Sequence, residues 1–311
     1  MKLSVMMITY NHERYLAQAL EGVLAQRVNF DYEIVVGEDC STDGTREILM
    51  DFHRRHPGKI VPLLRDRNMG AMPNAMETLA ACRGRYLALL EGDDYWTCAD
   101  KLQRQVDFLD AHPDYAICCH RAQVIAEIGK AWADAYPARA AGQYAIEDLF
   151  EGNWIPTCSV VYRWGSVGAL PDWFLDMKMG DWPLHVLVAR RGKINLMDES
   201  MAAYRVHAGG TWSSLPWIDQ VREMAKMLRA LDKHLGLEHT KAIRQTLAAL
   251  CCEKVTHARQ NGSRSDTARY LIEFVRNGGG WLPGQRRAFA AGAAYTLMGS
   301  WYKVFLKRKR D

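Results

Sequence analysis

The first two thirds of the chain alternate short apolar runs with helical patterns. Residues 3–9 form a continuous apolar run that ends in polar residues, and residues 13–26 then place leucine and valine at spacings of three and four. The two patterns recur three more times, with apolar runs at 33–36, 60–64 and 86–90 and helical spacings at 42–56, 73–82 and 100–111. Short buried strands that alternate with helices predict an α/β protein with a mostly parallel sheet and right-handed crossovers.

The pattern changes twice further along the chain. Residues 115–206 are mixed and predict strands at 116–120 and 159–162 and helices at 146–150 and 182–190. Beyond residue 214 the spacing is helical, with segments 217–235, 238–260 and 264–276 separated by glycine-containing breaks. We therefore expect two domains, 1–214 and 215–311.

Composition and charge support this division. The chain has 311 residues, of which 49% are apolar and 24% charged, which is typical of a globular protein and excludes intrinsic disorder and a small disulfide-stapled fold. Residues 1–214 carry a net charge of −6, whereas residues 215–311 carry +10. This asymmetry indicates different roles for the two parts.

The cysteines and the apolar segments favour a cytoplasmic protein. The eight cysteines show no C-x-x-C motif and no zinc spacing, so we interpret them as reduced, packed thiols. The N-terminus lacks the length and cleavage site of a signal peptide, and Lys303 interrupts the longest apolar stretch, 289–306, which is too short for a membrane span.

Polar clusters follow the four predicted strands, where ligands bind to open α/β sheets. The richest cluster holds Glu91, Asp93 and Asp94, three carboxylates in four residues. Such oxygen ligands suit Mg²⁺ or Mn²⁺, which could clamp a diphosphate. The alternative is an acidic turn that caps the next helix. Asp39 could likewise accept a nucleobase N–H or cap a helix, and Tyr10 could stack on a base or pack on the sheet rim.

Four ordered motifs make a family resemblance specific. They are MMITYN at 6–11, EDCSTDGT at 38–45, NMG at 68–70, and EGDDYW at 91–96 followed by DKL at 100–102. Over residues 1–214 the chain resembles a glycosyltransferase of family 2 with the GT-A fold. One departure is Glu91, which stands where the first aspartate of the usual D-x-D motif is expected.

The resemblance implies a nucleotide-sugar donor, a divalent metal, Mn²⁺ or Mg²⁺, and inversion at the transferred sugar. By similarity, Asp94 and then Asp93 would bind the metal. The residues implied in nucleotide-sugar binding are Thr9, Tyr10, Asn11, Asp39, Asn68, Gly70, Asp93, Arg205 and His207. For His207 the alternative is an ordinary structural histidine.

An inverting transfer needs a base that removes the proton of the acceptor hydroxyl. Asp181 matches the position of the family's catalytic aspartate and is our candidate, although it could also cap a helix ahead of Pro183. Trp154 and Trp182 could contact an acceptor sugar, and for Trp154 core packing is the alternative.

The C-terminal residues suggest further partners. Residues 297–310 have an apolar, aromatic stripe beside a cationic one and predict a helix that lies on an anionic membrane at the inner face of the cell membrane. The alternative is a packed helix with a solvated basic end. The helical region could also mediate homo-oligomerisation, whereas no nucleic-acid recognition motif is present.

The sequence thus predicts an inverting glycosyltransferase that transfers a sugar from a nucleoside-diphosphate donor to a saccharide or lipid-linked acceptor in bacterial surface polysaccharide biosynthesis. UDP is the expected nucleotide of the donor. Two alternatives remain at this point. A metal-dependent nucleotidyltransferase would use the same acidic residues, but the glycine-rich basic loop expected for it is missing after the first strand. A non-catalytic nucleotide-sugar-binding or scaffold protein would lack turnover.

Overall fold

The computed structural model describes residues 1–127, 133–166, 169–277 and 283–298. The chain divides into two compact units. One comprises Met1–Leu149 and Asn153–Ser214, and the other comprises Phe150–Gly152 and Leu215–Asp311. Each unit has its own hydrophobic core.

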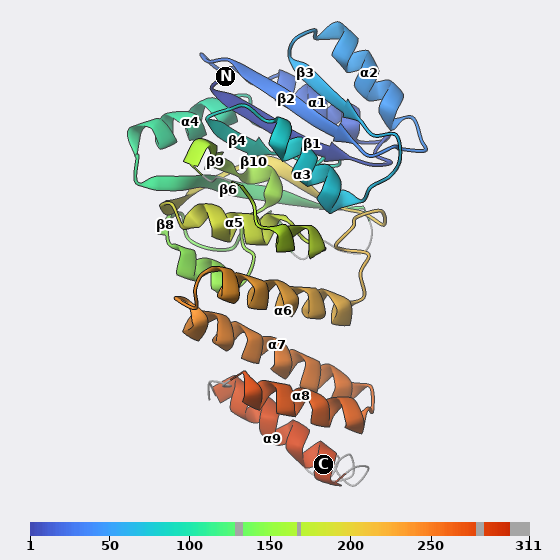
Figure 1. Ribbon diagram of the computed structural model, residues 1–311, viewed down its shortest axis with the longest axis vertical. Coiled ribbons are helices and arrows are strands. Elements are labelled where there is room, and N and C mark those ends of the chain that lie inside the picture. The colour runs from blue at the N-terminus through green and yellow to red at the C-terminus, as the bar shows by residue number, and fades with distance from the viewer. Residues whose placement is uncertain (128–132, 167–168, 278–282, 299–311) are drawn as a thin grey trace. The chain divides into compact units, whose positions relative to one another are not determined.

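The first unit is built on one sheet with the strand order β3-β2-β1-β4-β9-β6-β10-β5 (Figure 1). The parallel half consists of β1 Leu3–Thr9, β2 Tyr32–Glu38, β3 Ile60–Leu64 and β4 Tyr86–Leu89. The mixed half consists of β9 Val161–Arg163, β6 Tyr115–Ala126, β10 Lys193–Val206 and β5 Tyr95–Trp96. Two short strands, β7 Ala135–Tyr136 and β8 Gly142–Tyr144, pair with β6 and β10.

Helices flank this sheet. One buried cluster joins the strands to apolar side chains of α1 Leu16–Leu24, α2 Thr45–Arg55 and α4 Lys101–Ala111. Figure 1 shows α3 Ala71–Ala81 in front of the sheet, and α5 Asp181–Ala189 is almost entirely buried. Short 3-10 helices span Ile146–Phe150, Thr157–Ser159, Trp164–Ser166 and Asp172–Asp176. The predicted fold class, a mostly parallel sheet flanked by helices and followed by a helical region, is confirmed.

The first strand and helix show how local sequence sets these elements. All but one residue of β1 are buried, as its continuous apolar run predicts. The following helix begins at Leu16, three residues later than expected, because the His12 carbonyl accepts the N–H groups of Tyr15 and Leu16 in a turn, each at 2.9 Å. This turn leaves the His12 side chain outside the helix, at the end of β1.

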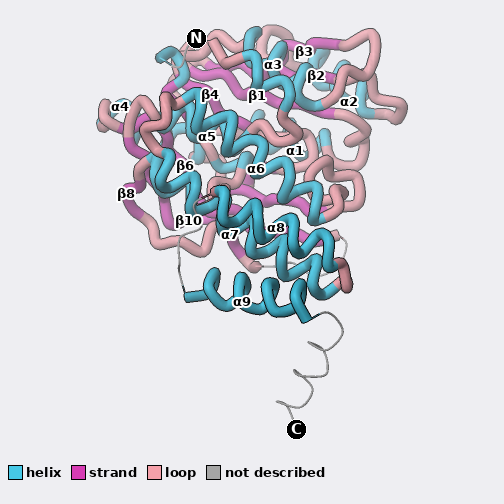
Figure 2. Tube along the Cα trace, turned by 60° about the horizontal axis from the view of Figure 1, so that its bottom comes forward, coloured by secondary structure: helices cyan, strands magenta, loops and turns pink. Residues whose placement is uncertain are grey.

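The second unit contains α6 Trp217–His234, α7 Thr240–Gln260, α8 Arg264–Arg276 and α9 Pro283–Met298, drawn as cyan tubes in Figure 2. Predicted helices 217–235, 238–260 and 264–276 agree with the first three to within two residues. Buried Lys254 on α7 is held by Glu273 on α8 at 3.2 Å, and the Ser263 hydroxyl accepts the Asp266 N–H at 3.3 Å to cap α8.

The proposed membrane-binding segment, 297–310, lies almost wholly outside the described residues, and its membrane role stays a prediction. None of the helices in the described part of the chain combines the length and the apolar character that a membrane crossing requires.

Gly37 of β2 provides a test of the packing between α3 and the sheet. A Cβ at this position would overlap the side chains of Thr78 and Asn74 on α3. We expect Gly37→Ala to lower the free energy of unfolding by about 1–3 kcal/mol, because a packed interface cannot absorb the added methyl group. Gly165→Ala, where no atom of the described residues is found within 4 Å of the new Cβ, should change it by less than about 0.5 kcal/mol. Urea denaturation measures both, and equal effects would contradict the packing argument.

Candidate active site

The loops that follow β1, β2 and β4 are tied together at the carboxyl edge of the parallel strands. The Asp39 N–H donates to the Thr9 carbonyl at 3.1 Å, and the Gly92 N–H donates to the Ile8 carbonyl at 3.0 Å. Because β1 lies between β2 and β4, the residues after all three strands meet at one edge. The candidate residues of these loops are therefore neighbours in space.

Asp39 organises the loop after β3. The carboxylate is buried and accepts the N–H of Met69 at 2.8 Å with one oxygen and the N–H of Gly70 at 2.9 Å with the other. Asn68 Oδ1 also accepts the Gly70 N–H, at 3.0 Å. Gly70 has a φ of +87°, a backbone conformation that favours glycine. Three predicted nucleotide-binding residues thus form one hydrogen-bonded unit.

The end of β1 carries the other predicted base-binding residues. Tyr10 is 40% exposed, so its ring is accessible. Asn11 has a φ of 54°, and its Oδ1 accepts the Thr42 N–H at 2.9 Å, which joins this turn to the loop after β2. Thr9 is buried, and its hydroxyl oxygen has no hydrogen-bond partner among the described residues.

Two carboxyl groups of the acidic turn have a raised pKa. Burial, together with the charge of Asp93, raises the pKa of Asp94 well above its usual range. Burial also raises the pKa of Glu91, and the charges of Asp93, Asp94 and Asp181 add to this effect. Asp94 Oδ1 accepts the Arg205 N–H at 2.8 Å, while Oδ2 is buried without a hydrogen-bond partner among the described residues. The two raised pKa values favour the neutral forms of Glu91 and Asp94, which lessens the repulsion within the turn.

Asp93 is the carboxyl of this turn whose pKa is lowered. Burial opposes its ionisation, but the hydrogen bond from His207 and the neighbouring His12 and His207 outweigh this and lower its pKa. His207 Nε2 donates to Asp93 Oδ2 at 2.9 Å, which raises the pKa of His207. His12 Nε2 lies 3.8 Å from the same oxygen, and burial lowers the pKa of His12.

These three side chains could hold a metal ion. Within the described residues they form one group of potential ligands, whose atoms lie within 4.8 Å of one another. Asp93 Oδ1 and His12 Nδ1 are buried without hydrogen-bond partners. Nitrogen and carboxylate donors with unmet polar atoms fit a divalent cation. Of the two predicted metal ligands, Asp93 belongs to this group, and Asp94 lies outside it.

Arg205 holds the end of β10 against the acidic turn. Its guanidinium donates to the Asp93 carbonyl and to Gln18 Oε1. The guanidinium also lies 4.6 Å from the ring centroid of Tyr95 and 5.0 Å from that of Tyr15. Several of its donors are used within the protein, so its visible role is to place the backbone that precedes His207.

Asp181 opens α5, and two neighbours orient it. Asn153 Nδ2 donates to Asp181 Oδ2 at 2.7 Å, and the Thr157 hydroxyl donates to the same oxygen at 3.3 Å. In the described part of the chain no hydrogen bond engages Oδ1. The effect of Asp181 on the pKa of Glu91 places it within the electrostatic reach of the acidic turn. A carboxylate whose one oxygen is fixed by hydrogen bonds, and whose other oxygen accepts none, can take a proton from a substrate.

The two candidate acceptor tryptophans are buried. Trp154 is 4% exposed and donates its indole N–H to the Asp148 carbonyl at 3.1 Å. Trp182 is 3% exposed and donates to the Leu149 carbonyl at 2.8 Å. Both side chains are thus packed inside the protein, which is the alternative raised for Trp154, and their contact with an acceptor stays a prediction.

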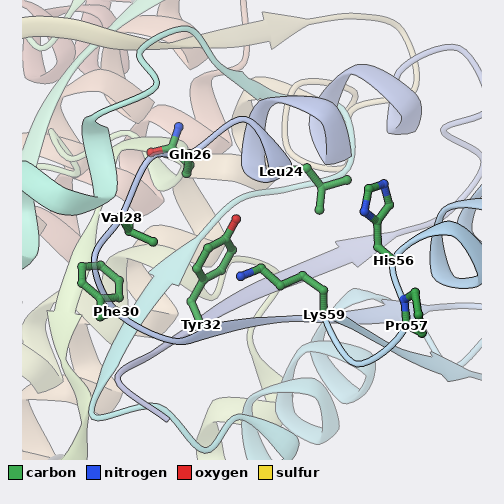
Figure 3. A pocket seen from close by; sticks show the side chains of 8 residues that line it. All are labelled: Leu24, Gln26, Val28, Phe30, Tyr32, His56, Pro57 and Lys59. Atoms are coloured by element: carbon green, nitrogen blue, oxygen red, sulfur yellow. The ribbon is translucent and has the colours of Figure 1, made fainter.

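Two cavities differ in their lining residues and in their position relative to the acidic turn. A cavity of about 570 Å³ adjoins His207 and is lined by Arg14, Tyr15, Glu127, His207, Ala208 and Gly209. A second one, of about 440 Å³, is shown in Figure 3 and lies around the start of β2, away from the acidic turn. There, Lys59 Nζ lies 3.2 Å from the ring centroid of Tyr32. The cavity beside His207 is the one that belongs to the candidate site.

Sequence reasoning missed the contributions of His12 and Asn153. His12 directly follows the TYN run that ends β1, which was a usable signal. Its distance to Asp93 depends on the order of β1 and β4 in the sheet, which no local pattern reveals. Asn153 lies 28 positions before Asp181, so their hydrogen bond likewise depends on tertiary structure.

Comparison with known proteins identifies the family. The family described as "Glycosyl transferase family 2" matches residues 4–174, and the chain belongs to it. The predicted family resemblance is therefore confirmed.

Relatives share much of the chain. The uncharacterized protein Rv1520 of Mycobacterium tuberculosis is 41% identical over 212 residues, which cover 68% of this chain and 61% of that protein. The chain thus spans about three fifths of the length of this relative. The uncharacterized glycosyltransferase alr2836 of Nostoc sp. is 32% identical over 227 residues, covering 69% of this chain and 67% of that one.

A solved structure shares the fold. The crystal structure of Staphylococcus aureus TarS 1–349 in complex with UDP-GlcNAc aligns with a TM-score of 0.66 and 16% identity over 96% of this chain and 92% of that chain. TarS is named a poly(ribitol-phosphate) β-N-acetylglucosaminyltransferase. The likeness establishes that the two chains share a fold.

Asp39→Asn tests the role of the Asp39 carboxylate. The substitution replaces one carboxylate oxygen by an NH₂ group, which is a donor and would face the donor N–H of Met69 or Gly70. We therefore expect the free energy of unfolding to fall by about 1.5–3 kcal/mol. We also expect faster hydrogen exchange at Met69 and Gly70. The matched control is Asp66→Asn, because Asp66 is exposed and belongs to the same loop. Unchanged protection of both amides in Asp39→Asn would contradict the assignment.

Proposed function

We propose that this protein is a metal-dependent inverting glycosyltransferase that transfers a sugar from a nucleoside diphosphate to a hydroxyl acceptor. The observation that carries the proposal is the meeting of a cation-binding group and an oriented carboxylate, Asp181, around one acidic turn in a family 2 chain. A divalent cation, when bound, would neutralise the charge that develops on the diphosphate leaving group. Asp93 and His207 would hold it.

The base and nucleoside would lie over the loops after β1, β2 and β3. Tyr10 offers an exposed ring for stacking. The Asp39 carboxylate already accepts two backbone N–H groups, but its oxygens have further lone pairs that could accept a base N–H. UDP-GlcNAc, the ligand of the TarS structure, is the first donor to test.

Asp181 would act as the base that activates the acceptor. Asn153 and Thr157 hold Oδ2, so Oδ1 is left to take the proton of the acceptor hydroxyl as that hydroxyl attacks the anomeric carbon. The bond to the diphosphate oxygen breaks on the opposite face of the sugar. The result is inversion, with the proton on Asp181 and the negative charge on the departing nucleoside diphosphate.

The acceptor would be a saccharide or a lipid-linked saccharide in bacterial surface polysaccharide assembly. The name of TarS, which modifies a poly(ribitol-phosphate), supports an acceptor of polymeric type. Attachment to an anionic membrane through residues 297–310 fits a lipid-linked acceptor and rests on the sequence pattern alone.

A thermal-shift panel of nucleotides tests the donor class. We expect UDP or UDP-GlcNAc with Mn²⁺ to stabilise the protein by about 2.7 kcal/mol at a ligand concentration 100 times the Kd. The unfolding entropy of a 311-residue chain is about 0.65 kcal/mol/K, so this stabilisation raises Tm by about 4 °C. GDP, ADP and each cation without nucleotide serve as controls. Absence of a response to every nucleotide with every cation would overturn the proposed function.

Asp181→Asn tests the base. The amide keeps the shape of the side chain but cannot accept the proton, so we expect the transfer rate to fall by about 10²–10⁴-fold. The affinity for UDP should stay within twofold of wild type, which is about 0.4 kcal/mol in binding free energy. Asp172→Asn, at an exposed aspartate nearby in the chain, should transfer at the wild-type rate. Release of UDP from UDP-GlcNAc with a bacterial acceptor extract measures both. Full activity of Asp181→Asn would exclude this role.

A further inference from the structure

We propose that His12 is a third protein ligand of the cation site. With His207 and Asp93 it would let the protein hold a first-row transition-metal ion before the donor binds and disfavour Mg²⁺. The inference rests on the proposed function, because it concerns the cation of the same site, and it adds a residue and a metal preference.

The three candidate ligands come from three different loops. His12 follows β1, Asp93 follows β4, and His207 follows β10. The side chains of His12 and Asp93 are 15% and 16% exposed, and that of His207 is 8% exposed. They are therefore shielded from bulk water, and one of them, His207, lines the neighbouring cavity. A donor could reach an ion held there from that cavity.

The distances suit shared coordination. Two ligand atoms bound at about 2.1 Å to one ion and at right angles to each other stand about 3.0 Å apart. His207 Nε2 and Asp93 Oδ2 are 2.9 Å apart, which is close to this value. His12 Nε2 is 3.8 Å from the same oxygen, within the span of about 4.2 Å allowed for opposite ligands of one ion. Small side-chain rotations would bring all three onto an ion.

His12 is packed against the acidic turn itself. A Cβ added at Gly92 would lie 2.9 Å from His12 Nδ1 and 2.7 Å from the Thr9 hydroxyl oxygen. Because Gly92 has no side chain, the imidazole can rest directly on the backbone that carries Asp93. Among the described residues, His12 Nδ1 and Asp93 Oδ1 are buried without hydrogen-bond partners, so each side chain keeps a polar atom that these residues do not satisfy.

Loading the site would also change the segment after β10. The Gly209 N–H donates to His207 Nδ1 at 3.2 Å. An ion on Nε2 requires the ring proton to sit on Nδ1, where it opposes this N–H. The ion would therefore replace two hydrogen bonds of His207, and the Gly209 amide should become free to face a ligand or solvent.

The donor set decides the metal preference. Two imidazole nitrogens and one carboxylate suit Mn²⁺, Co²⁺, Zn²⁺ and other transition ions. Mg²⁺ prefers oxygen ligands and keeps several waters, so replacing two of its oxygens by imidazoles is unfavourable. A site with Asp93 and His207 alone would show a weaker preference.

The experiment measures metal binding to the full chain without nucleotide. We expect titration with Co²⁺ to give the visible absorption of a nitrogen-containing site and calorimetry to detect Mn²⁺. Mg²⁺ should fail to compete at about 100-fold excess. Hydrogen exchange at Gly209 should rise when Co²⁺ is added.

Two variants test His12. His12→Ala should weaken Co²⁺ and Mn²⁺ by at least about tenfold, because loss of even an outer-shell partner costs that much. His12→Gln keeps a side chain of similar length and offers an oxygen, so it should narrow the preference for Mn²⁺ over Mg²⁺. His56→Ala, at a histidine that lines the other cavity (Figure 3), is the control and should bind as wild type does. Urea denaturation confirms that each variant is folded.

The outcomes separate this inference from the proposed function. Unchanged Co²⁺ affinity in both His12 variants, or equal binding of Mg²⁺ and Mn²⁺ by the wild type, overturns the role of His12. If UDP with Mn²⁺ still raises Tm in that case, the proposed function stands. A chain that binds Co²⁺ through His12 but responds to no nucleotide would retain the metal site and lose the glycosyltransferase assignment.

Discussion

The repulsion among the carboxylates of the acidic turn is the constraint on which the rest of the site depends. Glu91, Asp93 and Asp94 lie within four residues at the end of a buried strand, where water cannot screen their charges fully. Three features reduce this repulsion. Burial raises the pKa values of Glu91 and Asp94, the Arg205 backbone N–H donates to Asp94, and His207 hydrogen-bonds to Asp93. A bound cation would change all three balances together.

Strand β10 positions Arg205 and His207, which contact the acidic turn. It runs parallel to β6 through several irregularities of register and pairs with β5, the short strand directly after the acidic turn. Its end therefore brings Arg205 and His207 to residues more than 100 positions earlier in the chain. Asp39 is likewise engaged within the protein, because both of its carboxylate oxygens accept backbone N–H groups from the loop after β3. Many of the polar side chains at this edge therefore form hydrogen bonds that fix the shape of the loops.

The charge asymmetry of the chain corresponds to two kinds of structure. The acidic first part contains the sheet, whose carboxyl edge gathers carboxylates that a cation can join. The basic second part is helical, and buried Lys254 shows that some of its positive charge serves packing, since Glu273 holds it inside the helical unit. The charge at 297–310 is the part for which we propose an anionic membrane surface as the partner.

Local sequence was enough for the elements whose pattern is periodic or continuous. Residues 3–9 are mostly apolar because β1 is buried on both faces, and α8 begins and ends where its spacing and its Ser263 cap indicate. The motifs of family 2 likewise identified the loops that carry Tyr10, Asp39 and Asp93.

Tertiary structure alone decided the contacts between those loops. No periodicity marked most of β10, because its inner and outer residues do not alternate regularly. The pairing of His12 with Asp93 and of Asn153 with Asp181 depends on strand order and helix placement, which set distances between residues far apart in sequence. Sequence therefore determined which chemical groups the site contains, and the packing of the sheet determined which of them act together.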